Sequence, residues 1–322
     1  MRENSDPTGS KFEQMSREEI TRFQSAQLHR TLKQAAKSEY YSKKFKELNI
    51  DPDRYTSVDQ IRELPFTTKE DLRLSYPAKM LTVPADQIIR MHTSSGTTGK
   101  PTAIIHTRED VENWAELMAR CFAMAGAKPG MIFQNMSGYG LFTGGLGLHY
   151  GAERLGLWTI PAGAGNTARQ IMLIRDFGVK IVHATPSYAM HVAERMVQEG
   201  DDPKSLGIEI AFFGAEPYTE DMRLKLQELY GCKVFNSYGL SEMNGPGVGL
   251  ECQYQNGMHL WEDSYVVEVI DPITLEPVAD GEVGELVLTT LRRTGMPIIR
   301  YRTRDLTRII SGECPCGRKH VR

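Results

Sequence analysis

The stretch KIVHATPSYAMHVAERMVQ at residues 180–198 is followed by EIAFFGAEPYTEDMRLKLQELYG at 209–231 and CKVFNSYG at 232–239. Short apolar runs alternate here with segments that have the apolar periodicity of helices. Such alternation predicts βαβ units and a largely parallel, buried sheet with helices on it. The expected fold class is therefore α/β.

Helical signals precede this stretch. Apolar residues recur at steps of three and four between Arg108 and Gly126, which predicts a helix that faces the core. Ser16 and Glu19 form a capping box, so a long helix is expected to start there. Prolines interrupt residues 50–90, where short helices and turns are expected.

The pattern changes after about residue 257. The segments SYVVEVIDP, GEVGELVLTTL and MPIIRYR read as strands that are separated by turns, with no helix between them. An antiparallel β subdomain or distorted barrel is therefore expected over 257–322. The α/β body, with the N-terminal helices, is expected over 1–256.

Composition excludes several classes of protein. The 322 residues carry 38 Lys and Arg against 41 Asp and Glu, a net charge of −3, which argues against a nucleic-acid partner. The sequence has no apolar run of the roughly 18 residues that span a membrane and no signal-peptide core, so a cytoplasmic protein is expected. An odd number of scattered cysteines argues against a disulfide framework.

A glycine-rich loop, TSSGTTGKP at 93–101, follows a predicted strand over 88–92. Its hydroxyls, backbone N–H groups and the Lys100 ammonium are suited to surrounding phosphate oxygens. It is not a Walker A loop, because Ser94 and Pro101 occupy positions where that pattern needs Gly and Ser or Thr. The alternative interpretation is a flexible Ser/Thr/Gly turn at the surface.

The string SSGTTGKP resembles the signature loop of the adenylate-forming superfamily of acyl-CoA synthetases, luciferases and peptide-synthetase adenylation domains. FGAEP at 213–217, NSYGLSE at 236–242 and YRTRD at 301–305 resemble further motifs of that family, in the family's order. Taken singly, Tyr238 could be a half-buried aromatic, Glu242 a solvated acid at a helix start and Asp305 a turn former. Their common order favours the family.

The resemblance implies an ATP or AMP site. In it Tyr238 stacks on adenine, Glu242 orients Mg²⁺ and Asp305 binds both ribose hydroxyls, a task suited to two carboxylate oxygens. Catalytic charge stabilisation falls to Thr97, Thr98, Lys100 and Glu242. The full expected set is Ser94, Ser95, Gly96, Thr97, Thr98, Gly99, Lys100, Gly214, Ala215, Glu216, Pro217, Asn236, Ser237, Tyr238, Gly239 and Asp305.

A branch of the family is indicated by SGYGLFTGGLGLHYGAE at 137–153 and GNTARQI at 165–171, which resemble phenylacetate-CoA ligases. Absent side chains at Gly144, Gly145 and Gly147 are expected to leave room for a flat ring, against which Tyr139 and Phe142 pack. The alternative is a glycine-rich helix packed closely against the sheet. Arg304 stands where many members of the wider superfamily carry Gly.

Cysteine and histidine also suggest a zinc site. Cys314 and Cys316 lie together near the end of the chain, and Cys252 with His259 precedes them, which gives a possible Cys₃His set. The alternatives are exposed thiols, a buried Cys252 and a hydrogen-bonded His259, although the same ligase branch resembles this sequence here. The remaining cysteines, Cys121 on a helix and Cys232 at a strand start, are expected to be inert core residues.

The implied reaction has two steps: an aryl carboxylate attacks the α-phosphate of ATP, and the thiol of coenzyme A then displaces AMP. The expected partners are the acid, ATP and coenzyme A, with a second copy in a homodimer also considered. The sequence stops at CGRKHVR, before the hinge, the mobile C-terminal domain and the catalytic lysine of full-length relatives. Residues 1–322 are thus expected to bind ligands but turn over slowly. The alternatives are a nucleotide-binding module without turnover and a zinc-stabilised interaction protein with a vestigial pocket, against which the ATP motifs argue.

Overall fold

A computed structural model describes residues 10–93 and 101–322. The chain forms two compact units, the first built on Trp114–Met258 and the second on Ser10–Asn113 with His259–Arg322. The boundaries fall inside helix α5 (Arg108–Met124) and strand β9 (Met258–Leu260). The expected boundary after residue 256 lies close to the observed one, but residues 10–113 group with the C-terminal segment instead of the α/β body.

A seven-stranded sheet with the order β4-β3-β5-β6-β7-β8-β9 forms the centre of the first unit. Strands β4, β3, β5, β6 and β7 are parallel, as the alternating pattern predicts, whereas β7 and β8 are antiparallel. The strands are β3 (Ile132–Asn135), β4 (Trp158–Ile160), β5 (Ile181–Ala184), β6 (Ile210–Phe213), β7 (Lys233–Leu240) and β8 (Gly245–Glu251). The predicted α/β fold class is confirmed.

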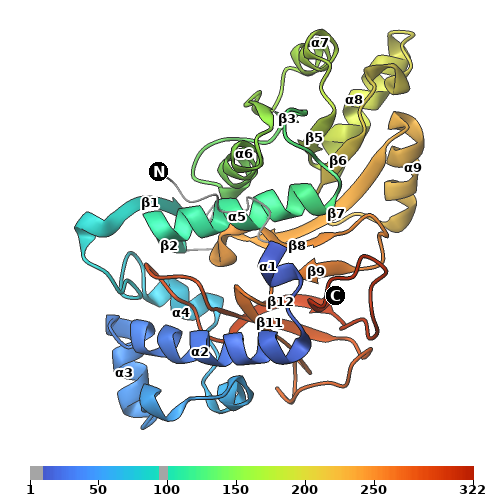
Figure 1. The fold of residues 1–322 in the computed structure, drawn as a ribbon. Coiled ribbons are helices and arrows are strands. Elements are labelled where there is room, and N and C mark those ends of the chain that lie inside the picture. Colours follow the sequence, from blue (N-terminus) through green and yellow to red (C-terminus); the bar gives the residue numbers. More distant parts are fainter. Residues whose placement is uncertain (1–9, 94–100) are drawn as a thin grey trace. The chain divides into compact units, whose positions relative to one another are not determined.

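Several helices of the first unit begin at residues whose side chains cap helix N-termini and end at glycines that favour helix C-termini. Side chains of Asn166, Thr185 and Thr219 cap α7 (Thr167–Phe177), α8 (Pro186–Gln198) and α9 (Glu220–Tyr230). Left-handed glycines end α6 (Thr143–Leu155), α7 and α9. Figure 1 shows α8 and α9 beside strands β5 to β7, where Val182, Val192, Ala211 and Leu226 share one apolar core.

The second unit contains a three-stranded antiparallel sheet in the order β10-β11-β12 (Tyr265–Ile270, Gly284–Thr290 and Tyr301–Thr307). A separate pair, β1 (Ile88–Thr93) and β2 (Ala103–Thr107), is also antiparallel. The segment MPIIRYR was expected to be a strand, but β12 begins only at Tyr301. Residue Arg300, with φ +46°, departs from extended backbone just before it.

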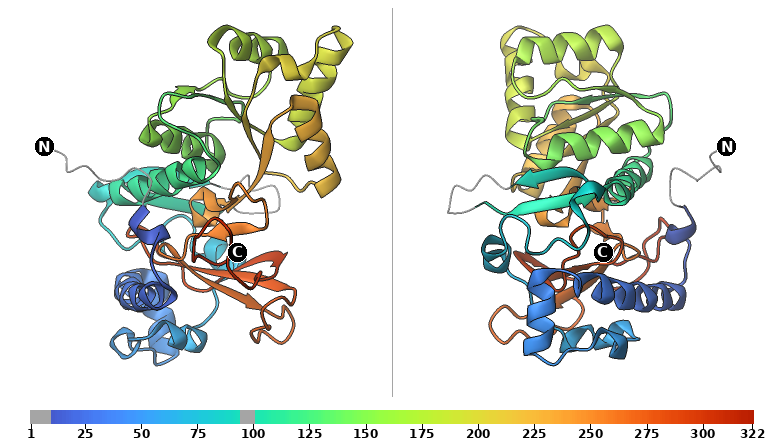
Figure 2. Two further views of the ribbon diagram at one scale, coloured as in Figure 1. Left: turned by 45° about the vertical axis from the view of Figure 1, so that its right-hand side comes forward. Right: turned by 90° about the vertical axis from the view of Figure 1, so that its left-hand side faces the viewer.

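Helices from the N-terminal part complete the core of this unit. The capping box of Ser16 and Glu19 starts α2 (Arg17–Ala35), as predicted. Leu28 and Leu32 of α2 pack in one buried cluster with Val266 and Ile299, which explains why the N-terminal segment groups with the C-terminal strands. Figure 2 shows the N-terminal helices, in blue, in the same unit as these strands, in orange and red. The other elements are α1 (Ser10–Glu13), α3 (Glu39–Glu47), η1 (Pro52–Arg54), η2 (Val58–Glu63), α4 (Lys69–Leu74) and η3 (Ala85–Gln87).

Across residues 10–93 and 101–322, none of the helices combines the length and the apolar character required to cross a membrane.

Candidate functional site

The carboxyl ends of the parallel strands in the first unit carry several of the predicted site residues. The segment 137–142 follows β3, Thr185 follows β5, residues 214–217 follow β6, and Tyr238 lies in the last part of β7. Because β4 and β5 lie on opposite sides of β3, the winding direction of the chain changes at β3. Open α/β sheets bind ligands at the carboxyl ends of strands beside such a switch point.

Close backbone approach joins the two motifs FGAEP and NSYGLSE. A Cβ atom at Gly214 would lie 2.7 Å from Oγ and 3.2 Å from the backbone O of Ser237, so any larger residue would crowd β7 here. Ala215 adopts the left-handed conformation with φ +68°. The carboxylate of Glu216 accepts hydrogen bonds from N (2.5 Å) and Oγ (3.0 Å) of Ser187 in the first turn of α8, which anchors the loop.

Glu242, the residue expected to orient Mg²⁺, lies in a short turn of 3₁₀ helix, η5 (Ser241–Met243), directly after β7. It is 6% exposed, so the interpretation as a solvated acid is wrong. Tyr238 is half-buried. The start of this motif is fixed by Glu251, whose Oε2 accepts the N–H of Asn236 at 2.8 Å and whose pKa is raised by burial.

The predicted phosphate-binding residues Ser94, Ser95, Gly96, Thr97, Thr98, Gly99 and Lys100 lie outside the described residues. The strands that flank them are described: Thr93 of β1 pairs with Ala103 of β2.

A buried acid in the second unit joins the end of β2 to the connection between β11 and β12. The carboxylate of Asp110 accepts the N–H groups of Thr107 (2.9 Å), Thr294 (2.6 Å) and Gly295 (3.0 Å), and the Thr294 hydroxyl at 3.1 Å. Sequence analysis overlooked this residue, although its place in the first turn of a helix predicts a capping acid. Asp305, the expected ribose ligand, lies in β12 of the same unit and is exposed.

The expected ring-binding residues follow β3. The ring of Tyr139 stands edge-on to that of His149 at 5.9 Å, and its hydroxyl lies 3.3 Å from Nδ1 of His149. Burial raises the pKa of Tyr139, so the hydroxyl stays protonated at neutral pH. Phe142 immediately precedes α6 and is 56% exposed.

The glycines of α6 do not all leave space. A Cβ atom at Gly144 would meet nothing within 4 Å, as the ring pocket requires. At Gly145 it would lie 2.4 Å from the carbonyl O of Gly138, and at Gly147 it would lie 2.3 Å from the Trp114 ring. Open space is thus present at Gly144, whereas Gly145 and Gly147 pack closely against the Gly138 carbonyl and the Trp114 ring.

Asn135, at the end of β3, organises this segment and was missed in the sequence. Its Nδ2 donates to the carbonyl O of Gly145 (2.9 Å) and to the hydroxyl of Tyr139 (3.1 Å). Its Oδ1 accepts the N–H (3.2 Å) and hydroxyl (2.7 Å) of Ser137 and lies 3.3 Å from Nδ1 of His183. Burial lowers the pKa of His183 to about 4, so this contact involves a neutral imidazole. The signal in the sequence that could have identified Asn135 is its position as a polar residue at the end of a buried strand.

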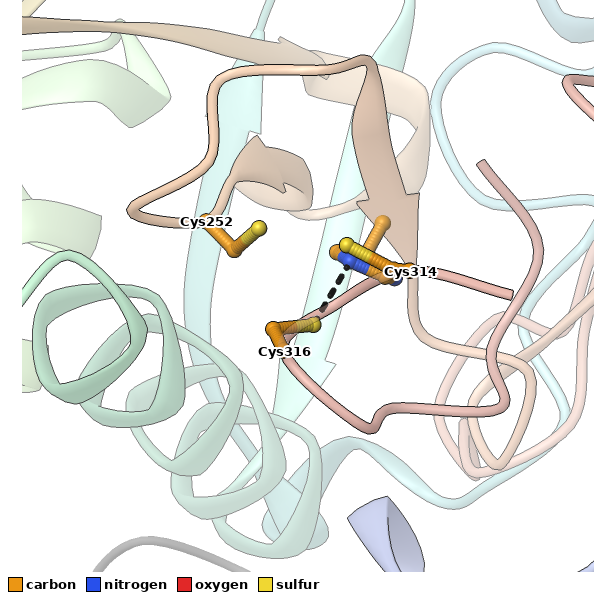
Figure 3. Close-up of side chains that lie close together, drawn as sticks. Cys252, Cys314 and Cys316 are labelled. Carbon is orange, nitrogen blue, oxygen red and sulfur yellow. Dashed lines mark hydrogen bonds between the residues drawn. The ribbon is translucent and has the colours of Figure 1, made fainter. Parts of the chain in front are cut away.

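The four residues proposed from the sequence as zinc ligands lie together. The ligand atoms of Cys252, His259, Cys314 and Cys316 are all within 4.8 Å of one another. Figure 3 shows the three thiols close together. A hydrogen bond joins Sγ of Cys316 to Nε2 of His259 at 3.3 Å. Around a tetrahedral zinc ion, sulfur ligands stand about 3.8 Å apart, given Zn–S bonds of about 2.3 Å. The spacing and the donor types fit such an ion.

The protonation states of His259 and Cys316 also suit a metal ligand, because a metal binds a neutral imidazole and a thiolate. Nδ1 of His259 lies 3.2 Å from the carbonyl O of His320, which can only accept, so Nδ1 carries the proton and Nε2 faces the thiols. Burial lowers the pKa of His259 to about 4. Burial opposes ionisation of Cys316, but hydrogen bonds from Arg318 and Cys314 and the Arg318 charge together lower the pKa of its thiol.

The remaining cysteines differ from these. Cys121 is fully buried on α5, and burial raises the pKa of the Cys232 thiol to about 12. A thiol that stays protonated at neutral pH is a poor nucleophile and a poor metal ligand, which agrees with the expected inert role.

Comparison with known proteins identifies the family. The model of the family described as AMP-binding enzyme matches residues 13–291. The chain is 45% identical to the phenylacetate-coenzyme A ligase of Thermus thermophilus, over 97% of this chain and 70% of that protein. It is also 45% identical to that of Pseudomonas putida, over 84% of this chain and 62% of that protein. The chain therefore spans about two thirds of the length of these relatives.

Solved structures agree. A 2-hydroxyisobutyryl-CoA ligase in complex with 2-HIB-AMP and CoA superimposes with a TM-score of 0.91 at 30% identity, over 97% of this chain and 70% of that chain. An anthranilate CoA ligase in complex with anthranoyl-AMP shares only 17% identity and a TM-score of 0.54, which indicates a common fold. The predicted family resemblance and the predicted fold are confirmed. The chain belongs to the AMP-binding enzyme family, in its phenylacetate-coenzyme A ligase branch.

Proposed function

We propose that the chain carries the ATP- and aryl acid-binding part of an AMP-forming acid–thiol ligase. Phenylacetate or a similar aryl acid is converted to an acyl-adenylate with release of pyrophosphate, and coenzyme A then takes the acyl group with release of AMP. The observation that carries this proposal is the contact of FGAEP with NSYGLSE, at Gly214 and Ser237, on the carboxyl edge of a parallel sheet in a chain of this family.

The first step is a problem of charge. A carboxylate must approach the α-phosphate of ATP, and two anions repel each other unless their charge is offset. Thr97, Thr98 and Lys100 are the proposed donors to the phosphates. Glu242, buried and next to the adenine motif, is the proposed ligand for Mg²⁺. When bound, Mg²⁺ would supply positive charge to the phosphate oxygens.

The nucleotide assignment can be tested at Asp305. Asp305→Ala should weaken AMP binding by about 1.5–3 kcal/mol, the range for hydrogen bonds to a charged group. Isothermal titration calorimetry with AMP gives the affinity, and Asp280→Ala, an exposed acid of the same unit, is the control. An unchanged AMP affinity in Asp305→Ala would remove the ribose assignment.

The acid site can be tested at the glycine with open space. Gly144→Leu should fill the open space at this position and weaken phenylacetate binding while AMP binding is kept. Gly147→Leu is the contrasting variant, because its side chain would collide with Trp114 and lower stability instead. Loss of phenylacetate and AMP together in Gly144→Leu would contradict the assignment.

We also propose a closed structural zinc site at Cys252, His259, Cys314 and Cys316. A complete set of four protein ligands keeps no position for a substrate, so the metal would stabilise the fold and take no part in the reaction. Elemental analysis of protein washed with a mild chelator should find about one zinc ion per chain, and Cys314→Ser should lose it. Metal-free protein with an unchanged melting temperature would contradict the site.

A further inference from the structure

Strand β12 contains a wide bulge that includes the proposed ribose ligand, Asp305. Arg302 pairs with Val287 of β11, and Leu306 pairs with Glu285. Between these pairs β11 has one residue, whereas β12 has the three residues 303–305. The two additional residues of β12 are not placed by the ladder, so side chains must fix their conformation.

The middle residue of the bulge has an unfavourable backbone conformation. Arg304 has φ +69°, in the left-handed region that residues with a Cβ atom rarely adopt. Such a residue persists only when its surroundings hold it. Because Arg304 directly precedes Asp305, this conformation determines the direction in which the Asp305 side chain points from the strand.

One carboxylate, that of Glu285 on β11, accepts hydrogen bonds from a residue of the bulge and from Arg302 beside it. Glu285, whose side chain is 1% exposed, accepts hydrogen bonds from Nε (3.2 Å) and one terminal nitrogen (2.5 Å) of Arg302. Its Oε1 also accepts the backbone N–H of Arg304 at 3.2 Å. The hydroxyl of Thr303 donates to the carbonyl O of Leu286 (2.8 Å) and accepts the N–H of Asp305 (3.1 Å).

We infer that Glu285 is a positioning residue for nucleotide binding: it holds Arg304 in the left-handed conformation and thereby directs Asp305 towards the ribose. The inference rests on the proposed function, in which Asp305 binds the ribose hydroxyls. Glu285 touches no ligand itself. Its contribution therefore depends on the ribose hydroxyls being present in the ligand.

The same sheet offers a matched control. Glu268 of β10 forms a buried bidentate ion pair with Arg300, through Nε at 3.0 Å and a terminal nitrogen at 2.8 Å. The pair resembles that of Glu285 with Arg302 in chemistry and burial, but no hydrogen bond joins Glu268 to residues 303–305 among the contacts of the described residues. Glu285→Gln and Glu268→Gln thus remove equivalent charges, one at the bulge and one away from it.

The experiment compares AMP with 2′,3′-dideoxy-AMP. We expect the parent protein to bind AMP at least about tenfold more tightly, since charged hydrogen bonds to the hydroxyls are lost with the dideoxy ligand. Glu285→Gln, like Asp305→Ala, should reduce this preference to less than about threefold. Glu268→Gln should retain it, even if its melting temperature falls as much.

The outcomes separate the two levels of the proposal. A parent protein without any preference, or without AMP binding, would overturn the proposed ribose site itself. If the parent shows the preference, Asp305→Ala abolishes it and Glu285→Gln keeps it, the inference about Glu285 is overturned alone. An equal loss in Glu285→Gln and Glu268→Gln would assign both acids a purely structural role.

A rescue variant tests the backbone argument. Glycine adopts φ near +69° without a steric cost, so it does not need to be held. Arg304→Gly in the Glu285→Gln background should therefore restore most of the preference for AMP, by about fivefold relative to Glu285→Gln alone. A double variant with the same affinities as Glu285→Gln would show that Glu285 does not act through Arg304.

Discussion

In the first unit the segments that follow β3 and β4 are held by neutral amide side chains, whereas the loops of the antiparallel unit are held by carboxylates. In the first unit Asn135 fixes the segment after β3, and Gln170 donates to the carbonyl O atoms of Gly163 (2.8 Å) and Gly165 (3.0 Å). In the second unit Asp110 and Glu285 perform the same task.

The difference has a physical reason if the proposed ligands are correct. The segment after β3 contains the proposed acid site, and a buried carboxylate beside the anionic aryl acid would repel it in a medium of low dielectric constant. Amides supply directed hydrogen bonds without that repulsion. Carboxylates form stronger hydrogen bonds, worth about 1.5–3 kcal/mol each against about 1 kcal/mol for neutral ones. The second unit should therefore respond more strongly to loss of its organisers than the first.

Asp110 should show the largest effect. Asp110→Ala removes the acceptor of three backbone N–H groups and one hydroxyl, and we expect the free energy of unfolding to fall by at least about 3 kcal/mol. Urea unfolding followed by circular dichroism measures this change. Glu109→Ala, the exposed neighbour in the same helical turn, should stay within about 0.5 kcal/mol of the parent. Similar losses in both variants would break the comparison.

His183, although neutral in the folded protein at pH 7, should make the stability of the first unit depend on pH. Its folded pKa of about 4 lies below the ordinary value near 6.5, so between these pH values the unfolded chain binds a proton that the folded chain does not. Stability should fall as pH falls through this window, by about 3 kcal/mol from this residue.

Unfolding curves at pH 7 and pH 4.5 provide the test. His106 and His259 also have lowered pKa values and contribute to the slope in the same sense. The informative quantity is therefore the difference between the parent and His183→Gln, which should lose less stability on acidification. Equal slopes would mean that His183 is accessible to protons in the folded state.

Asn135 should show an intermediate effect. Asn135→Ala removes two donated hydrogen bonds and the acceptor of Ser137, at a cost of about 2 kcal/mol in unfolding free energy. Asn135→Asp sharpens the comparison, because it places a negative charge beside Tyr139. Phenylacetate affinity, measured by calorimetry, should fall further in Asn135→Asp than in Asn135→Ala. The reverse order would contradict the argument about anion repulsion.

Arg304→Gly should show the smallest effect and the opposite sign. Relief of the left-handed conformation should stabilise the protein by up to about 1 kcal/mol, and the contact of the exposed Arg304 side chain with Glu285, at 3.7 Å, contributes little. Arg308→Gly, which has no positive φ, should destabilise instead by about 0.5–1 kcal/mol. Thermal unfolding of both variants gives the two signs. Destabilisation by both would show that the Arg304 side chain is important in itself.

Much of the first unit was predictable. The alternation between residues 180 and 239 predicted the parallel strands, because each segment has the period of its own secondary structure and lies in contact with its successor along the chain. The capping box at Ser16 predicted the start of α2 for the same local reason. The glycines of α6 were harder, because an absent side chain leaves room for either a ligand or a neighbouring helix, and sequence periodicity does not distinguish these.

The sequence alone determined the family, the order of its motifs and the residue types at the nucleotide site, since these depend on short contiguous strings such as SSGTTGKP and NSYGLSE. It also supplied the four zinc ligands as candidates. Only the tertiary structure decided that residues 10–113 belong with the C-terminal strands, that Glu242 is buried and that Glu285 contacts the bulge that contains Asp305. Each of these depends on contacts between residues that are distant in sequence. Hydrophobic burial drives such contacts, and because it is non-directional, the sequence does not show which distant apolar residues will meet.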